Sequence, residues 1–139
     1  MCSSSVVGIN LELVTIVVNN YDEAIAFYVD VLGMELIEDS PSVAGSGMAK
    51  RWVVVRAPLS VTGMLLAQAD GEAQVAAIGN QTGGRVGFFL RVDDFGETYD
   101  RMVAAGVEFV TEPRDEDYGR VVVFVDIAGN RWDLLGPVA

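Results

Sequence analysis

The feature that most constrains the fold is an internal repeat, in which one pattern of strand, capped helix and further strands occurs twice. Residues 11–18 (LELVTIVV) have the length and the β-branched composition of a strand. Asn20, with Glu23 three positions later, is typical of a helix N-cap and its capping-box partner. An apolar helical stripe follows at Ile25, Tyr28, Val29 and Leu32. Gly33 then indicates the end of the helix, where the backbone turns left-handed.

The second half of the chain repeats these signals in the same order. Residues 85–92 (RVGFFLRV) indicate a strand, Asp94 and Glu97 a capped helix start, and Gly106 the helix end. The two caps lie 74 residues apart, and the two helix-ending glycines lie 73 apart. The later strands correspond as 34–39 with 107–112, 51–55 with 120–124, and 63–68 with 130–135. Such self-similarity predicts two copies of one structural unit.

We therefore predict an α+β fold of two tandem β-α-β-β-β modules that form a single domain, 1–139. Module one spans about 9–69, a linker about 70–83, and module two about 84–137. Each module has one helix for a sheet with two faces, so curved mixed sheets leave a cleft on the other face. Alternation along the first strands places Leu13 and Gly87 in this cleft. The linker is either a plain connection or an ordered lid over the pocket.

Charge and length exclude several classes of function. The chain has 9 basic and 20 acidic residues, a net charge of -11, which disfavours nucleic acid and anionic membranes as partners. Its longest apolar stretches, such as 86–90 and 121–125, are too short to span a bilayer. Residues 1–5 lack the pattern of a signal peptide, and the single cysteine, Cys2, excludes an internal disulfide. We therefore expect a cytoplasmic protein.

The absence of histidine limits the available chemistry further. With no histidine, the chain lacks the commonest metal ligand and the usual general base.

Three segments of the chain carry a family resemblance. NNYDEAIAFYVDVLGMEL, RVDDFGETYDRMVAAGVEF and the closing DIAGNRWDLL resemble the vicinal oxygen chelate superfamily, which includes glyoxalase I, bleomycin-resistance proteins and extradiol dioxygenases. The resemblance covers the chain from about Leu11 to Leu135. It implies the paired-module fold, but this scaffold hosts isomerases, dioxygenases, resistance proteins and pure binders.

The resemblance also implies where a metal would bind. Metal-using members often carry His or Gln on the first strand of each module and Glu on each last strand. The corresponding positions here are Leu13, Gly87, Leu66 and Asp133, with Gln68 as the nearest polar substitute for Leu66. Catalytic zinc or iron needs about three protein ligands, so we expect no metal cofactor. A weakly held divalent ion at Asp133 is the alternative.

The cleft is expected to bind a small molecule. We predict that its lining comprises Leu13, Trp52, Leu66, Gln68, Gly87, Phe89, Arg91, Tyr118, Arg120, Phe124 and Asp133. Asp133 is the best catalytic candidate, although a purely structural role is equally open. Arg51 and Arg120 occupy equivalent repeat positions. Their guanidinium groups either bind an acidic ligand through paired hydrogen bonds or are surface charges. Trp132 should face away from the cleft, because it neighbours Asp133.

The leading hypothesis is a metal-independent binder of a small, largely apolar molecule, acting by resistance or sequestration. The alternative is a lyase, isomerase or dioxygenase with a reduced metal site at Asp133. A structural or regulatory dimer is the third class. A homodimer is expected from the resemblance, since many relatives build the cleft by pairing modules across subunits.

Overall fold

The first module is a four-stranded mixed sheet crossed by one helix. The computed structural model describes residues 7–42 and 49–138, so the expectations placed on Cys2 and residues 1–5 lie outside the described residues. The elements in order are β1 (Leu13–Val18), α1 (Tyr21–Ile25), η1 (Ala26–Val31), β2 (Glu35–Ser42), β3 (Lys50–Arg56) and β4 (Gly63–Gln68). The strand order is β1-β4-β3-β2, in which β1 and β4 are parallel and the other pairs antiparallel.

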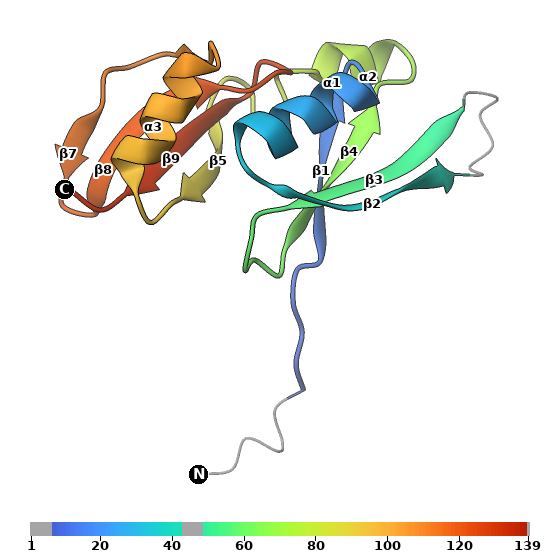
Figure 1. Cartoon of the computed structure of the whole chain (residues 1–139). Coiled ribbons are helices and arrows are strands. Elements are labelled where there is room, and N and C mark those ends of the chain that lie inside the picture. Colours follow the sequence, from blue (N-terminus) through green and yellow to red (C-terminus); the bar gives the residue numbers. More distant parts are fainter. Residues whose placement is uncertain (1–6, 43–48, 139) are drawn as a thin grey trace.

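The second module repeats this topology after the linker, which contains α2 (Glu72–Ala77). Its elements are β5 (Val86–Arg91), α3 (Phe95–Ala104), β6 (Glu108–Phe109), β7 (Arg114–Glu116), β8 (Gly119–Val125) and β9 (Arg131–Gly136). The strand order is β5-β9-β8-β6, with β7 paired to β8 (Figure 1). The predicted α+β fold of two like modules is confirmed.

The helix boundaries follow from the capping residues. Asn20 Oδ1 accepts a hydrogen bond from the Glu23 N–H at 2.9 Å, and Asp94 Oδ1 accepts one from the Glu97 N–H at 3.1 Å. Gly33 ends the first helix with a φ of 84°, as only glycine does readily. The first helix differs from expectation in its second half, because η1 is a π-helix, with the Leu32 N–H donating to the Phe27 carbonyl at 3.0 Å.

One hydrophobic core spans both modules. It lies between the sheets and the helices and includes Ile16, Val18, Tyr28, Val53, Leu66, Met102, Phe124, Trp132 and Leu134. The Tyr28 hydroxyl of module one donates to Asp126 Oδ2 of module two at 2.6 Å, and both residues are buried. Trp132 Nε1 donates to the same oxygen at 2.8 Å. The modules therefore share a polar contact inside a common core.

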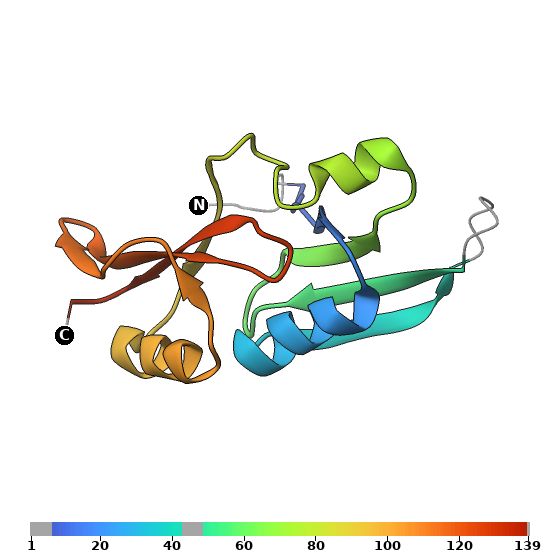
Figure 2. The ribbon, with the colours of Figure 1, turned by 90° about the horizontal axis from the view of Figure 1, so that it is seen from above.

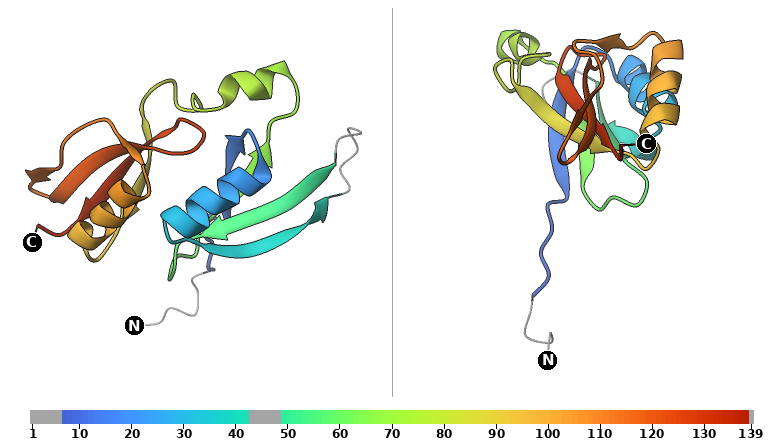
Figure 3. Two further views of the ribbon diagram at one scale, coloured as in Figure 1. Left: turned by 45° about the horizontal axis from the view of Figure 1, so that its top comes forward. Right: turned by 90° about the vertical axis from the view of Figure 1, so that its left-hand side faces the viewer.

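The two helices and the linker lie on opposite sides of the sheets. Figures 2 and 3 show α1 and α3 side by side on one side, with α2 and the rest of the linker on the other. We use "open face" for the sheet surface that points away from α1 and α3. No helix among the described residues is long and apolar enough to cross a membrane.

Candidate functional site

A groove runs along the open face of module one. It has a volume of about 430 Å³ and is called the sheet groove below. Its lining comprises Asn10, Glu12, Leu13, Ile37, Glu38, Trp52, Val54, Arg56, Ser60, Val61 and Gly63. The floor is apolar and comes from β1 and β3, whereas charged side chains stand around it. Such a groove suits an organic molecule with an apolar body and a few polar groups.

The two tryptophans have opposite roles. Trp52 is 40% exposed and lines the sheet groove, which agrees with its predicted place. Trp132 is only 3% exposed and stacks on Phe88 and Phe124 inside the core, as its position next to Asp133 predicts. Trp52 thus offers a large, accessible aromatic surface to an apolar ligand in the same groove as Leu13.

The structure corrects the predicted register of β4 by one residue. Leu66 is fully buried in the core, where it pairs with Ile16, so it does not line the open face. Leu65 pairs with Thr15 in module one, and Asp133 pairs with Phe89 in module two. Thr15 and Phe89 are equivalent positions of the repeat, so Leu65 is the residue equivalent to Asp133. Because side chains alternate along a strand, a slip of one residue exchanges the two faces. Leu65 is the open-face residue that sequence reasoning missed.

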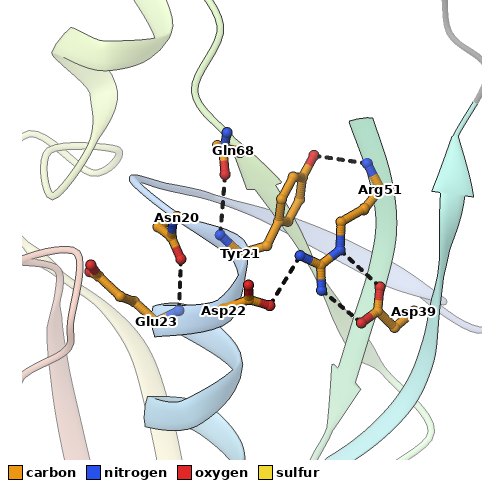
Figure 4. Close-up of polar contacts among 7 residues, drawn as sticks. All are labelled: Asn20, Tyr21, Asp22, Glu23, Asp39, Arg51 and Gln68. Atoms are coloured by element: carbon orange, nitrogen blue, oxygen red, sulfur yellow. Dashed lines mark hydrogen bonds and ion pairs between the residues drawn. The ribbon is translucent and has the colours of Figure 1, made fainter. Parts of the chain in front are cut away.

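Gln68 lies beside the first helix rather than in the sheet groove. Its Oε1 accepts a hydrogen bond from the Tyr21 N–H at 3.3 Å, at the first residue of α1 (Figure 4). The neighbouring Arg51 contacts Asp39 at 2.7 Å and Asp22 at 3.0 Å, and lies over the Tyr21 ring. This guanidinium lowers the pKa of the Asp39 carboxyl by a hydrogen bond. Gln68 and Arg51 thus stabilise the helix side of module one.

Arg120 and Phe124 also lie away from the open face. Arg120 Nε donates to Asp115 Oδ1 at 2.7 Å, an exposed pair across β7 and β8. Phe124 is fully buried and stacks on Trp132. Both residues share the side of β8 that carries the buried Val122. The prediction that Arg120 and Phe124 line the cleft is therefore wrong. Arg120 is a surface charge, which was the alternative interpretation.

Asp133 lies on the open face of module two. It pairs with Phe89 of β5 and Val123 of β8, and Phe89 is 64% exposed. Partial burial raises the pKa of the Asp133 carboxyl, while the charge of Arg114 on β7 lowers it by a smaller amount. No hydrogen bond reaches the Asp133 carboxylate from the residues that the structure describes. It is a half-buried acceptor beside an exposed aromatic ring.

The remaining predicted residues of module two stand at the edges of this face. Arg91 is exposed at the end of β5, and Tyr118 is 55% exposed in the turn between β7 and β8. Arg114 was not predicted from the sequence, and it reaches the open face because β7 pairs with Val121 of β8. Its guanidinium donates to Glu116 Oε2 at 2.6 Å.

The linker is ordered and contacts the open-face side of both modules. The Gln81 side chain accepts a hydrogen bond from the Val17 N–H at 2.7 Å and donates one to the Thr15 carbonyl at 3.0 Å. Thr82 lies over Gly87, so that a Cβ at Gly87 would come within 2.7 Å of the Thr82 methyl group. The linker thus fixes the edge of β1 and covers the start of β5, but none of its residues lines the sheet groove.

The side chains on the open face do not fit a catalytic metal. The four repeat-related positions are Leu13, Leu65, Gly87 and Asp133, and Asp133 alone has a ligating atom. In 7–42 and 49–138, no three Cys, Asp or Glu side chains gather into a group that could hold a metal. A single carboxylate falls short of the three protein ligands typical of catalytic sites.

Comparisons with known proteins agree with the fold. A sequence profile of the Glyoxalase/Bleomycin resistance protein/Dioxygenase superfamily matches residues 10–134. An uncharacterized protein of Shewanella frigidimarina (strain NCIMB 400) is 50% identical over 123 residues, which are 88% of this chain and 89% of that protein. The crystal structure of UcmS2 superposes with a TM-score of 0.76 at 32% identity, covering 93% of this chain and 98% of that one. TnmS3, an antibiotic binding protein from Streptomyces sp. CB03234, gives a TM-score of 0.72 at 27% identity, with 92% and 95% covered.

Proposed function

Because the chain belongs to the Glyoxalase/Bleomycin resistance protein/Dioxygenase superfamily, we propose that it binds and sequesters a small, largely apolar molecule on its open face without a metal ion. The observation that carries the proposal is an open face with accessible aromatic rings, on which Asp133 alone of the four repeat-related residues has a ligating atom. Leu13 and Leu65 stand at two of the four repeat-related positions, and Trp52 and Leu13 both line the sheet groove. The similarity to TnmS3, an antibiotic binding protein, supports an organic ligand of this kind.

Each part of the open face would make a different contact. The sheet groove offers Trp52, Leu13 and Val54 to a ring or an alkyl group. Module two offers Phe89 for stacking and Asp133 as a hydrogen-bond acceptor, or as a donor when protonated. A carboxylate without a protein partner is a natural anchor for a hydroxyl or amino group on the ligand.

The proposal includes a homodimer in which the open faces of two copies close around the ligand. Trp52 of module one and Phe89 of module two are 40% and 64% exposed, so each module has a large apolar ring on its open face for a second copy to cover. Since one protein layer covers only one side of each sheet, a second copy would supply the opposite wall. Cytoplasmic location remains a prediction from the sequence.

Ligand binding is tested with a panel of polycyclic aromatic and acidic aromatic compounds, followed by the fluorescence of Trp52 and by thermal unfolding. A ligand present at a hundred times its Kd should stabilise the protein by about 2.7 kcal/mol. Trp52→Phe should abolish the fluorescence change and weaken binding, whereas Trp132 lies in the core and should not respond. Binding that is unchanged by Trp52→Ala and Phe89→Ala would refute the open face as the site.

Metal independence is tested separately. The protein purified without chelator should carry no stoichiometric divalent metal by elemental analysis, and ligand affinity should be the same with and without EDTA. One tightly held ion per chain would overturn this part of the proposal.

A second function is favoured by the environment of Asp133 alone. A carboxylate whose pKa is raised by partial burial, and which has no hydrogen-bond donor among the described residues, resembles a general base. In this alternative the chain is a lyase or isomerase that draws a proton from a carbon acid with Asp133. Turnover that disappears in Asp133→Asn, while ligand affinity is retained, would favour the enzyme over the binder.

A further inference from the structure

A second groove lies on the helix side of the molecule, where the two modules meet. It has a volume of about 630 Å³ and is called the junction groove below. Its lining comprises Glu23, Ala26, Phe27, Asp30, Val31, Ala105, Gly106, Val107, Glu108, Val125, Asp126 and Ile127. These residues come from α1 and η1 on one side. On the other side they come from the turn after α3, from β6, and from the end of β8 and the turn that follows it. The groove shares no lining residue with the sheet groove.

We propose that the junction groove binds a small organic cation with an apolar body, such as an aryl-alkyl ammonium. The groove has the size and the mainly apolar lining of small-molecule sites. Val31, Val107 and Ile127 provide aliphatic surface, and Ile127 is 46% exposed although it carries no polar group.

The charges around the junction groove have a single sign. Glu23, Asp30 and Glu108 line it, and no lysine or arginine does. None of these three carboxylates takes part in an ion pair among the residues that the structure describes. Figure 4 shows the Glu23 side chain pointing away from the Arg51 cluster. Arg101 on α3 is paired with Glu97 and donates to the Leu32 carbonyl.

The fourth acid in the lining, Asp126, is not available to a ligand. Its carboxylate accepts hydrogen bonds from Tyr28, Trp132 and Asn130 side chains and from three backbone N–H groups. Asp126 therefore holds the wall of the groove. Phe109 packs on Phe124 in the core, so the side chain of the preceding Glu108 points to the other face of the sheet, and Glu23 and Asp30 supply the attraction for a cation. The overall charge of -11 adds a long-range attraction of the same sign.

The π-helix is an independent sign that this place is specialised. Ala26, Phe27, Asp30 and Val31 all belong to η1 and all line the junction groove. The second module ends its helix α3 without such a segment, although its cap and its final glycine are equivalent. π-Helical turns are rare, and those that occur inside α-helices are frequently found at functional sites. Here the wider turn places Phe27 and Val31 along the groove while Tyr28 reaches Asp126.

The test is a titration with 2-phenylethylammonium, followed by methyl resonances in NMR at low salt. The expected result is a saturable shift of Val31, Val107 and Ile127 methyl groups, and no shift at Val54 or Leu65 on the open face. The neutral 2-phenylethanol and the anion 3-phenylpropanoate have similar shapes and should bind more weakly or not at all.

Variants complete the test. Glu23→Gln and Asp30→Asn should each raise the Kd about 1.5- to 5-fold, the range typical of exposed ion pairs. The matched control Glu72→Gln, an exposed carboxylate on α2 outside the groove, should leave the Kd unchanged. Ala26→Phe, which fills the groove from an exposed helix position, should abolish the methyl shifts without changing stability.

Three results would overturn the proposal. They are the absence of saturable shifts at the groove methyl groups, equal affinity for the neutral alcohol, and an unchanged Kd in the Glu23→Gln/Asp30→Asn double variant. None of them bears on the open face, so this test and the tests of the proposed function fail independently.

Discussion

Replacing Tyr28 by Phe should measure the strength of the contact that joins the two modules. The Tyr28 ring is fully buried and packs against Phe27 and Trp132, and phenylalanine keeps this packing. The change removes one hydrogen bond of 2.6 Å to the Asp126 carboxylate. Hydrogen bonds to charged groups contribute about 1.5–3 kcal/mol. The same oxygen still accepts from Trp132 Nε1 and Asn130 Nδ2, so no buried acceptor is left without a donor.

We therefore expect Tyr28→Phe to lower the free energy of unfolding by about 2 kcal/mol. For a chain of 139 residues, an unfolding entropy of about 0.29 kcal/mol/K converts this loss into a Tm lower by about 7 °C. Urea unfolding should give a lower midpoint with an unchanged m-value, because the native surface is the same.

Tyr99→Phe is the matched control. The Tyr99 ring packs between Phe95 and Phe109, and no side-chain hydrogen bond reaches its hydroxyl from the described residues. Its loss should change stability by less than about 0.5 kcal/mol. If the two variants lose the same free energy, the Tyr28–Asp126 contact does not hold the modules together as reasoned here.

Three further predictions concern individual positions. Leu66→Ala should lower the free energy of unfolding, measured with urea, by about 2–5 kcal/mol, and Leu65→Ala clearly less, because of the two only Leu66 is in the core. The reverse ranking would mean that Leu66 lies on the open face. Burial beside Asp126 raises the pKa of Tyr28, so its contribution is complete below the unfolded-state value of about 10 and is lost as pH rises beyond it. Stability measured from pH 8 to 11 should therefore fall less in Tyr28→Phe than in the parent protein, and equal slopes would contradict this. Partial burial likewise raises the pKa of Asp133, so the protonated form is favoured in the folded state and stability declines as pH rises through that pKa. Asp133→Asn should then raise the Tm at pH 7 and have no effect well below pH 3, whereas a lower Tm at pH 7 would mean that the carboxylate makes favourable contacts.

The elements that carry local signals were predictable from the sequence. Asn20 and Asp94 accept the expected hydrogen bonds, and Gly33 and Gly106 have the expected positive φ. These features depend on a few neighbouring residues, and their repetition at one offset made the fold evident. The location of Trp132 in the core followed from simple alternation along β9.

The wrong predictions concern strands in which polar and apolar residues do not alternate. The β4 sequence GMLLAQ and the β8 sequence GRVVVFV are almost continuously apolar, so nothing in them says which residue faces the core. Leu66 and Phe124 were misplaced for this reason. The contact of Gln81 with Thr15 spans 66 residues, and no local pattern announces it. The π-helical turn has no sequence signal that we recognise.

The hydrogen bonds between the Gln81 side chain and β1 restrict how two copies can associate. β1 is an edge strand of its sheet, and the free N–H and C=O groups of an edge strand are a template for pairing with another chain. The Gln81 amide makes the two hydrogen bonds with Val17 and Thr15 that a neighbouring strand would make. This stretch is thereby closed to continuous sheet formation between molecules and to the aggregation that begins there. Two copies that meet at this end of the sheet must do so through side chains.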